Sequence, residues 1–176
     1  MGGFVATFFC VFIVGSRATE PVEAMSAENI SRRSRLRRNH WLAWMGLCGA
    51  LAFHVADEAS TGFLDLYNPA VRELREKYPL LLLPTFTFEV WLGLLIFAIV
   101  MLIAASFFVW KGRWAMRPIS HVFAVFMLTN GLLHIAVWLY MREWVSGVYS
   151  SPLLITASIV LIAHTCAYQR AKFNLD

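Results

Sequence analysis

Long apolar stretches alternate with short polar ones along this chain of 176 residues. Four of the apolar stretches, at roughly 41 to 60, 85 to 110, 119 to 141 and 150 to 169, reach the ~20 residues that a helix needs to cross a bilayer. Hydrophobic residues make up 59% of the sequence and charged residues only 15%, a balance typical of membrane proteins. The pattern therefore predicts an all-α protein, a four-helix transmembrane bundle over residues 41–170 that is embedded in a lipid bilayer.

Positive charges are unevenly distributed between the connections of this predicted bundle. The members of the larger group lie in three places: before the first stretch, between the second and the third, and after the fourth. They are Arg32, Arg33, Arg35, Arg37, Arg38, Lys111, Arg113, Arg117, Arg170 and Lys172. The smaller group, which is mixed with acidic residues, is Arg72, Arg75, Lys77 and Arg142. Because cytoplasmic loops are enriched in lysine and arginine, we expect both termini on the cytoplasmic side of a cytoplasmic (inner) membrane. No aromatic residues interleave with the arginine run, so we expect no nucleic-acid partner.

Residues 1–40 form a basic N-terminal extension. An apolar run at residues 4–14 is too short to cross a bilayer, and no basic residue precedes it as one would in a signal peptide. Translation from Met25 is as good an interpretation as translation from Met1. Residues 16–38 contain almost nothing apolar, so we expect them to be poorly ordered. Residues 171–176 are expected to form a cytoplasmic tail.

The connection between the first two apolar stretches carries its own helical signal. Val71, Leu74 and Tyr78 are spaced as on one face of a helix, and charged residues fill the positions between them. We predict a short amphipathic helix over Val71 to Lys77, lying on the membrane surface. Such a helix could cover a site, although a connector that rests on lipid headgroups is the simpler interpretation.

Costly polar residues interrupt the apolar stretches at two places. His54, Asp57 and Glu58 stand at positions i, i+3 and i+4, which bring three side chains to one face of a helix. Asn130 and His134 repeat the i, i+4 spacing in the third stretch. Because a charge that faces lipid costs several kcal/mol, such residues cluster around a cation or share protons. Both groups therefore point to one functional site.

Helix rise predicts that these polar residues lie at one depth. At about 1.5 Å per residue, His54 lies roughly 20 Å above the start of its stretch and Glu58 roughly 26 Å. His134 lies roughly 22 Å above the start of the third stretch by the same arithmetic. Glu89 begins the stretch that descends from the opposite side, at the level of Glu58. We therefore expect polar residues from three helices to share one layer.

Histidine and carboxylate ligands together suit Zn, Fe or Mn, so the predicted cofactor is a divalent metal. The candidate ligands are His54, Asp57, Glu58, Glu89 and His134, a set that resembles the ligands of di-metal helix bundles. The Glu-x-x-His and HExxH spacings of known sites are absent. Asn130 would hydrogen-bond a ligand or a substrate. In an enzyme, Glu58 or Asp57 would be the catalytic general base, acting on a lipid or other hydrophobic substrate.

Three alternatives remain open at this stage. The histidines could bond carboxylates in a metal-free lock between helices, or the carboxylates could carry protons in a ligand-binding or transport module. A haem-b protein would pair His54 with His134 and His121 with His164, but His121 and His134 point roughly 220° apart around one helix. The cysteines Cys10, Cys48 and Cys166 form no CxxC pair, and we expect them to be packing residues.

The polar positions also support a family assignment. His54-x-x-Asp57-Glu58, then Glu89 and Asn130-x-x-x-His134, resembles the HXXEE-domain family of small membrane proteins. Asp57 stands where the signature has its first glutamate, and a Tyr-x-Pro-Gly signature is matched only loosely at Tyr149 to Leu153. The resemblance covers roughly residues 41 to 170. It implies four membrane helices and a metal-dependent activity, and it supplies no substrate.

Overall fold

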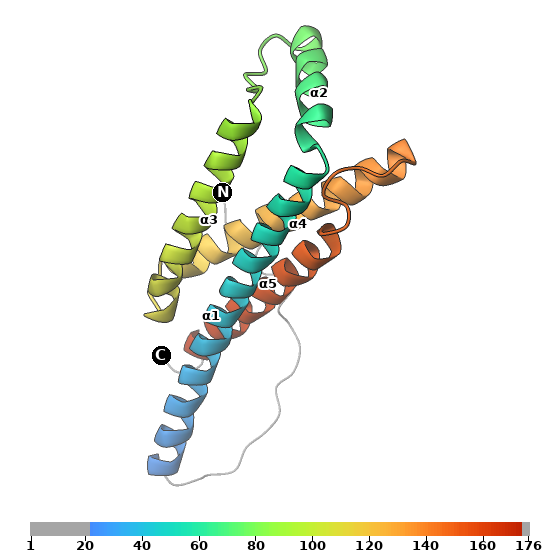
Figure 1. Cartoon of the computed structure of the whole chain (residues 1–176). Helices are drawn as coiled ribbons and strands as arrows, with labels where there is room; N and C mark the ends of the chain where they lie inside the picture. Colours follow the sequence, from blue (N-terminus) through green and yellow to red (C-terminus); the bar gives the residue numbers. More distant parts are fainter. Residues whose placement is uncertain (1–21, 174–176) are drawn as a thin grey trace. The chain divides into compact units, whose positions relative to one another are not determined.

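The computed structural model describes the backbone of residues 22–173 and the side chains of residues 28–167, and the described residues form five α-helices and no strand (Figure 1). The helices are α1 (Val22–Ser60), α2 (Phe63–Lys77), α3 (Phe88–Trp110), α4 (Met116–Met141) and α5 (Ser151–Phe173). The predicted all-α class is confirmed. Contacts group the chain into Met1–Ser31 and Arg32–Asp176, and the hydrophobic core and the candidate site both belong to the second unit.

Helix α1 begins well before the apolar stretch that starts at Trp41. Its residues from Val22 onward are helical, so the prediction that this part of the basic extension is poorly ordered is wrong. Neither glycine nor proline occurs between Val22 and Met45, and the arginines and alanines there favour a helix. Residues 4–14 with Cys10, and residues 16–21, lie outside the described part of the chain.

Helix α2 is longer than the predicted Val71 to Lys77. It follows α1 after a sharp turn in which Gly62 adopts φ 74°, and it includes Pro69. The Asn68 amide donates a hydrogen bond of 2.9 Å to the Phe86 carbonyl and accepts one of 3.1 Å from the Phe86 N–H. These two bonds fasten α2 to the segment that leads into α3, and they offset the backbone bond that Pro69 cannot make.

The hydrophobic core is built by side chains from α1, α3, α4 and α5. Trp44 of α1 is fully buried, packs against Phe123 of α4 with ring centroids 5.1 Å apart, and donates its indole N–H to the Leu102 carbonyl of α3 at 3.0 Å. Leu154 and Leu161 bring α5 into the same cluster. Helices α4 and α5 lie side by side (Figure 1). This packing holds the end of α1 against the connection between α4 and α5.

Among the described residues, α3 and α4 are long and apolar enough to cross a membrane. The apolar part of α5, Ser151–Ala167, is shorter. The apolar part of α1 is interrupted by His54, Asp57 and Glu58, whose polar side chains lower its hydropathy. Two of the four predicted spans therefore meet the criteria of length and composition, and the four-span bundle itself stays a prediction.

Candidate metal centre

The end of α1 carries the polar motif on its buried stripe. Leu47 and Leu51 lie on this stripe two turns and one turn before His54, and His54 and Glu58 follow at helical spacing with exposed fractions of 1% and 6%. Packing of the apolar part of α1 thus carries an imidazole and a carboxylate into the interior. Asp57 stands one turn after His54 and is half-buried.

Helix α4 supplies the second imidazole. His134 has an exposed fraction of 8%, and Asn130 lies one turn before it. The rings of His134 and His54 meet edge to face, with centroids 4.8 Å apart and planes at 80°. The depth arithmetic from the sequence therefore placed the two histidines at the same level, as the structure has them.

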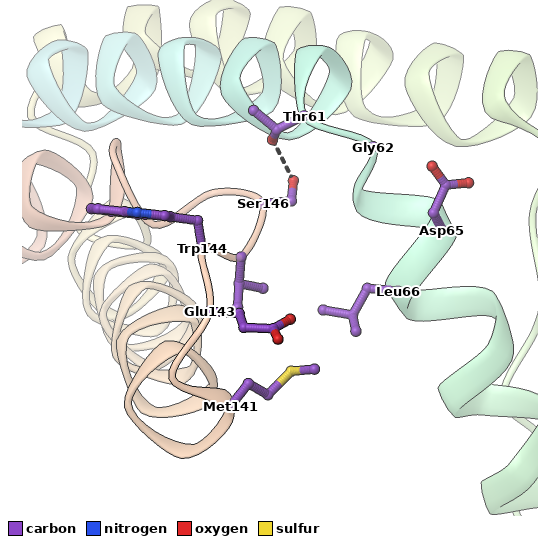
Figure 2. Close-up of a pocket in the computed structure, with 9 residues that line it drawn as sticks. Thr61, Gly62, Asp65, Leu66, Met141, Glu143, Trp144 and Ser146 are labelled. Carbon is purple, nitrogen blue, oxygen red and sulfur yellow. Dashed lines mark hydrogen bonds between the residues drawn. The ribbon is translucent and has the colours of Figure 1, made fainter.

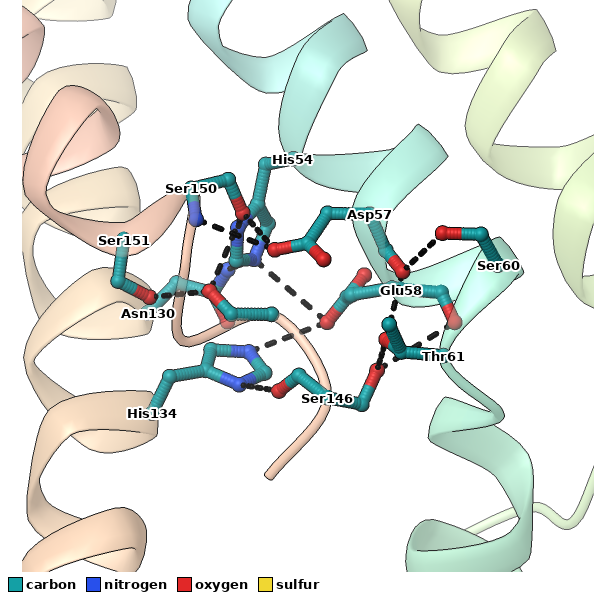
Figure 3. Close-up of polar contacts among 11 residues, drawn as sticks. His54, Asp57, Glu58, Ser60, Thr61, Asn130, His134, Ser146, Ser150 and Ser151 are labelled. Atoms are coloured by element: carbon teal, nitrogen blue, oxygen red, sulfur yellow. Dashed lines mark hydrogen bonds and ion pairs between the residues drawn. The ribbon is translucent and has the colours of Figure 1, made fainter. Parts of the chain in front are cut away.

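Three atoms that could bind a metal ion converge between these helices (Figure 3). Glu58 Oε1 lies 3.1 Å from His134 Nε2 and 3.5 Å from His54 Nε2. The metal-ligating atoms of His54, Glu58 and His134 all lie within 4.8 Å of one another. In a tetrahedral zinc site with bonds of about 2.0–2.1 Å, adjacent ligand atoms are ~3.3 Å apart. The two contacts of Glu58 bracket that spacing.

The hydrogen bond of His134 fixes where its lone pair points. His134 Nδ1 lies 2.7 Å from the carbonyl oxygen of Ser146, which can only accept, so Nδ1 carries a hydrogen. The other nitrogen of a neutral imidazole then has a lone pair. That nitrogen, Nε2, is the atom that faces Glu58.

His54 is oriented in the same way by a hydroxyl. Ser150 Oγ donates to Asp57 Oδ2 at 2.6 Å, so it accepts from His54 Nδ1, which lies 2.7 Å away. The Asn130 amide nitrogen, at 3.1 Å, donates to His54 Nε2. With neutral histidines, His54 Nε2, His134 Nε2 and Glu58 Oε1 are three acceptors that lie close together, and a metal bound at His54 Nε2 would take the place of the hydrogen bond from Asn130.

Such a set of acceptors fits a cation. Ligating histidines typically donate their other ring N–H to a carbonyl or a carboxylate, which fixes the tautomer and the ring orientation. Ser146 and the Asp57–Ser150 pair do this here for His134 and His54. The donor set of two imidazoles and one carboxylate suits Zn, Fe or Mn and leaves a coordination position for another ligand.

The connection between α4 and α5 closes over the two histidines. Gly147 has φ 80°, and a Cβ atom there would lie 2.8 Å from His134 Cε1 and 3.0 Å from His54 Cε1. Only glycine fits both the left-handed backbone and the contact. The same connection contributes the Ser146 carbonyl and the Ser150 hydroxyl, so one short segment positions both imidazoles (Figure 3).

The structure brings three of the five predicted ligands together. Asp57 instead accepts from both the N–H (3.1 Å) and the hydroxyl of Ser150, just before the N-terminus of α5, where a carboxylate is favoured. Glu89 is exposed in the first turn of α3 and is not among the converging groups. Its carboxylate is favoured there too, because the first N–H groups of the helix are positive. The Asn130 amide nitrogen lies 3.1 Å from His54 Nε2, and its role beside a ligand or a substrate stays a prediction.

Sequence reasoning missed Ser146, Gly147 and Ser150. The hydroxyls of Ser151, Thr156 and Ser158 donate instead to carbonyls of the preceding turn. The one available signal was the presence of serines on both sides of Gly147, directly before a helix. The haem alternative does not fit this arrangement, because Glu58 Oε1 lies against both Nε2 atoms.

Comparison with known sequences identifies the family. The family model described as a protein of unknown function with HXXEE motif matches residues 44–162. No curated protein and no solved structure matches the chain. His54, Asp57 and Glu58 supply the motif, with aspartate in place of the first glutamate. Because the match covers more than half of the chain, the protein belongs to the HXXEE family.

Proposed function

We propose that this protein is a four-span integral membrane protein that binds a divalent metal through His54, Glu58 and His134 and acts on a lipid or other hydrophobic substrate. The spans are residues 41–60, 85–110, 119–141 and 150–169, and both termini lie on the cytoplasmic side. The observation that carries the proposal is the convergence of three acceptor atoms whose orientation is fixed by other hydrogen bonds.

The exposed apolar surface of α3 and α4 supports the location in a membrane. In the most apolar part of each helix, only 11% of α3 and 28% of α4 is buried. Side chains such as Phe97, Val100 and Phe126 have exposed fractions of 64%, 55% and 68%. A helix that is apolar all round and unburied is stable when lipid surrounds it. A core helix of a soluble protein would have most of this surface covered.

A pocket beside the metal centre supports the substrate class. It has a volume of about 310 Å³ and lies between the start of α2 and the connection that follows α4 (Figure 2). Leu66, Met141 and Val145 give it an apolar wall, and the hydroxyls of Thr61 and Ser146 bond each other at 2.7 Å along it. Ser146 also accepts the hydrogen bond of His134, so pocket and metal centre share a residue. The carboxylates of Asp65 and Glu143 also line the pocket, so it suits a small molecule that has both an apolar and a polar part.

The chemistry follows from the donor set. A bound divalent ion would supply Lewis-acid catalysis. Asp57 and Glu58 are the carboxylates at the site, and we propose that one of them is the general base. Ser150 holds Asp57 in place through two hydrogen bonds, and Asn130 and Ser150 hold His54.

One observation favours a second function, proton-coupled transport or ligand binding without a metal. Hydrogen bonds and ion pairs run continuously from Asp57 through Ser150, His54 and Glu58 to His134. Such a chain of titratable groups can pass a proton inside a membrane protein. This function would give a pH-dependent flux or binding signal that survives treatment with a chelator.

Elemental analysis of detergent-purified protein tests the metal centre. We expect one equivalent of Zn, Fe or Mn in the unmodified protein and its loss in both His54→Ala and His134→Ala, with helix content unchanged by circular dichroism. His164→Ala is the matched control, because His164 lies outside the converging group, and it should keep the metal. Metal content that is normal in His54→Ala would refute the proposal. Absence of metal from every form would favour the metal-free alternatives.

A further inference from the structure

A dense group of arginines covers the part of α1 that precedes the first predicted span. Its members all have exposed side chains, and they are Arg32, Arg33, Arg35, Arg37 and Arg38. No acidic residue occurs between Arg32 and Trp41. Helix α1 runs without a break from these arginines into the apolar stretch, so its geometry fixes their distance from that stretch (Figure 1). The metal centre lies at the other end of α1.

The connection between α3 and α4 adds two cations at the same level. The rings of Trp41 and Trp110 meet edge to face with centroids 5.2 Å apart, so α3 ends beside the start of the apolar part of α1. Lys111 and Arg113 follow directly and are exposed. Both lie over phenylalanine rings of α3, with 5.3 Å and 5.5 Å between the cationic group and the ring centroid. These two residues and the five arginines of α1 together form one basic surface.

The helix rise places this basic surface at the level of lipid headgroups. Arg38 lies roughly 5 Å and Arg35 roughly 9 Å along α1 from Trp41, where the first predicted span begins. The polar layer on each side of a bilayer is roughly 5–8 Å thick. Tryptophans, which are enriched at membrane–water interfaces, mark the same level, because Trp110 and Trp114 have exposed fractions of 44% and 76%. The arginines nearest the span therefore lie among headgroups in the proposed membrane.

Charge alone does not explain the composition of the basic surface. The orientation of a protein in a membrane depends on the number of lysines and arginines, and either residue serves. Six of the seven cations here are arginines, and Lys111 is the exception. A guanidinium presents its N–H groups in a rigid fork that binds two oxygens of one phosphate, whereas the lysine ammonium acts as a point charge. The composition therefore favours a phosphate ligand.

The two ends of the predicted bundle differ in how their cations are balanced. Among the described residues, no ion pair involves a member of the basic surface. The cations at the opposite end are Arg72, Arg75, Lys77 and Arg142. Acidic residues are interspersed with them, namely Asp65, Glu73, Glu76 and Glu143. Only the basic surface therefore carries an uncompensated positive charge, and the opposite end supplies a matched control.

We infer that the basic surface binds the phosphate headgroups of anionic phospholipids in the cytoplasmic leaflet. This inference rests on the proposed membrane location and orientation, and it is independent of the metal centre. At roughly 100° per residue, the five arginines point all around α1, with no gap wider than roughly 100°. A protein or a nucleic-acid duplex would contact one side of the helix, whereas headgroups surround it. Basic clusters directly beside a span on the cytoplasmic side are typical of such binding.

Retention of lipid by the purified full-length protein tests the inference. The protein is mixed with equimolar phosphatidylglycerol and phosphatidylcholine in dodecyl maltoside, separated by gel filtration, and its bound lipids are measured by mass spectrometry. At low salt we expect a preference for phosphatidylglycerol of at least about fivefold, the factor that one basic residue at a membrane surface contributes. At about 1 M salt, where charges are screened beyond about 3 Å, the preference should largely disappear.

Equal retention of the two lipids at low salt would overturn the inference and leave the membrane location intact. A protein that retains neither lipid and stays monodisperse without detergent would refute the membrane location as well. Inorganic phosphate or a short DNA duplex is added at the concentration of the lipid phosphate as a competitor. Neither should displace the retained phosphatidylglycerol, and displacement by either would assign the surface to a soluble ligand and overturn the inference.

Two triple variants locate the binding on the molecule. We expect Arg35→Gln, Arg37→Gln and Arg38→Gln together to remove most of the preference for phosphatidylglycerol. These side chains are exposed, so the variant should unfold at the same temperature as the unmodified protein. Substitution of Arg72, Arg75 and Lys77 by glutamine removes the same charge at the opposite end and should leave the preference unchanged. An equal loss in both variants would show that net charge selects the lipid, and it would overturn the inference. Metal content should stay normal in both variants.

Discussion

Two histidines of α4 illustrate how the partner of one lone pair sets the chemistry. His134 and His121 each donate Nδ1–H to a carbonyl, from Ser146 and Arg117 respectively, so each presents Nε2 as an acceptor. At His134 that atom faces the Glu58 carboxylate, another acceptor, so either a proton or a metal ion between the two atoms is favourable. At His121 it faces the Cys166 thiol, which brings its own proton. The same backbone device thus turns one imidazole toward a carboxylate and the other toward a thiol.

The two histidines also differ in where the carbonyl that accepts their Nδ1–H lies in the fold. The Arg117 carbonyl belongs to the same helix, one turn away, so the orientation of His121 follows from helix formation alone. The Ser146 carbonyl lies in the connection after α4, so the orientation of His134 depends on tertiary structure. The metal centre should therefore respond to changes in the connection, and the contact between His121 and Cys166 should not.

Replacing the acceptor at the metal centre should have the largest effect. Glu58→Gln removes the negative charge but keeps the shape of the side chain. The site then lacks the charge that favours a cation beside the two Nε2 atoms. We expect metal affinity to fall by more than the 10–100-fold that is typical for loss of a group that orients a ligand. Competition with a chelator measures it.

Glu143→Gln is the matched control, because Glu143 lines the neighbouring pocket and is exposed. This variant should bind metal as the unmodified protein does. Equal affinities in the two variants would show that Glu58 is not a ligand.

Gly147→Ala should be the next most damaging change. Its Cβ would lie 2.8 Å from His134 Nδ1, and alanine is strained at φ 80°. We expect a loss of ~1–3 kcal/mol in the free energy of unfolding, together with weaker metal binding. Thermal unfolding in detergent and the chelator competition measure the two effects.

Gly49→Ala gives the contrast, because no atom lies within 4 Å of a Cβ placed there and the residue is within α1. That change should be neutral or stabilising by up to ~1 kcal/mol. If the two alanine variants unfold at the same temperature, the connection does not clamp the histidines.

Ser150→Ala tests whether Ser150 positions His54. The variant loses the hydroxyl that accepts from His54 Nδ1 and donates to Asp57, so the imidazole is free to change its tautomer. We expect metal affinity to fall about 10–100-fold while the ligands themselves remain. Thr156→Ala removes an exposed hydroxyl that bonds only its own helix, and it should leave affinity unchanged. A Ser150→Ala protein with full affinity would rule out the positioning role.

The sequence predicted the helices and the depth of the histidines, because both depend on local periodicity and a fixed rise per residue. The same arithmetic placed Glu89 at the level of Glu58, but depth does not determine the direction of a side chain around its helix. Glu89 is exposed at the start of α3, whereas Trp91 is the buried residue there. Ser146 and Ser150 could not be predicted as partners of the histidines, because they meet them only after α1, α4 and α5 pack.

The smallest expected effect concerns His40, which lies just outside the first predicted span. It is buried and contacts Ser120 Oγ at 2.9 Å, next to His121. Burial, with Arg117, His164 and His121 as further causes, lowers the pKa of His40 from 6.5 to about 4. Between these two values the unfolded chain binds a proton that the folded protein does not, so stability falls as the pH falls from about 6.5 to about 4.

His40→Gln removes this contribution of His40 and should flatten the pH dependence of the unfolding temperature in that window. The difference between the two proteins isolates His40 from the other histidines, and metal affinity should stay constant because His40 is remote from the converging ligands. Parallel pH profiles would mean that His40 binds a proton equally well in both states. A loss of metal in this variant would instead show that the two ends of α4 are coupled, against the independence inferred from their separate anchoring carbonyls.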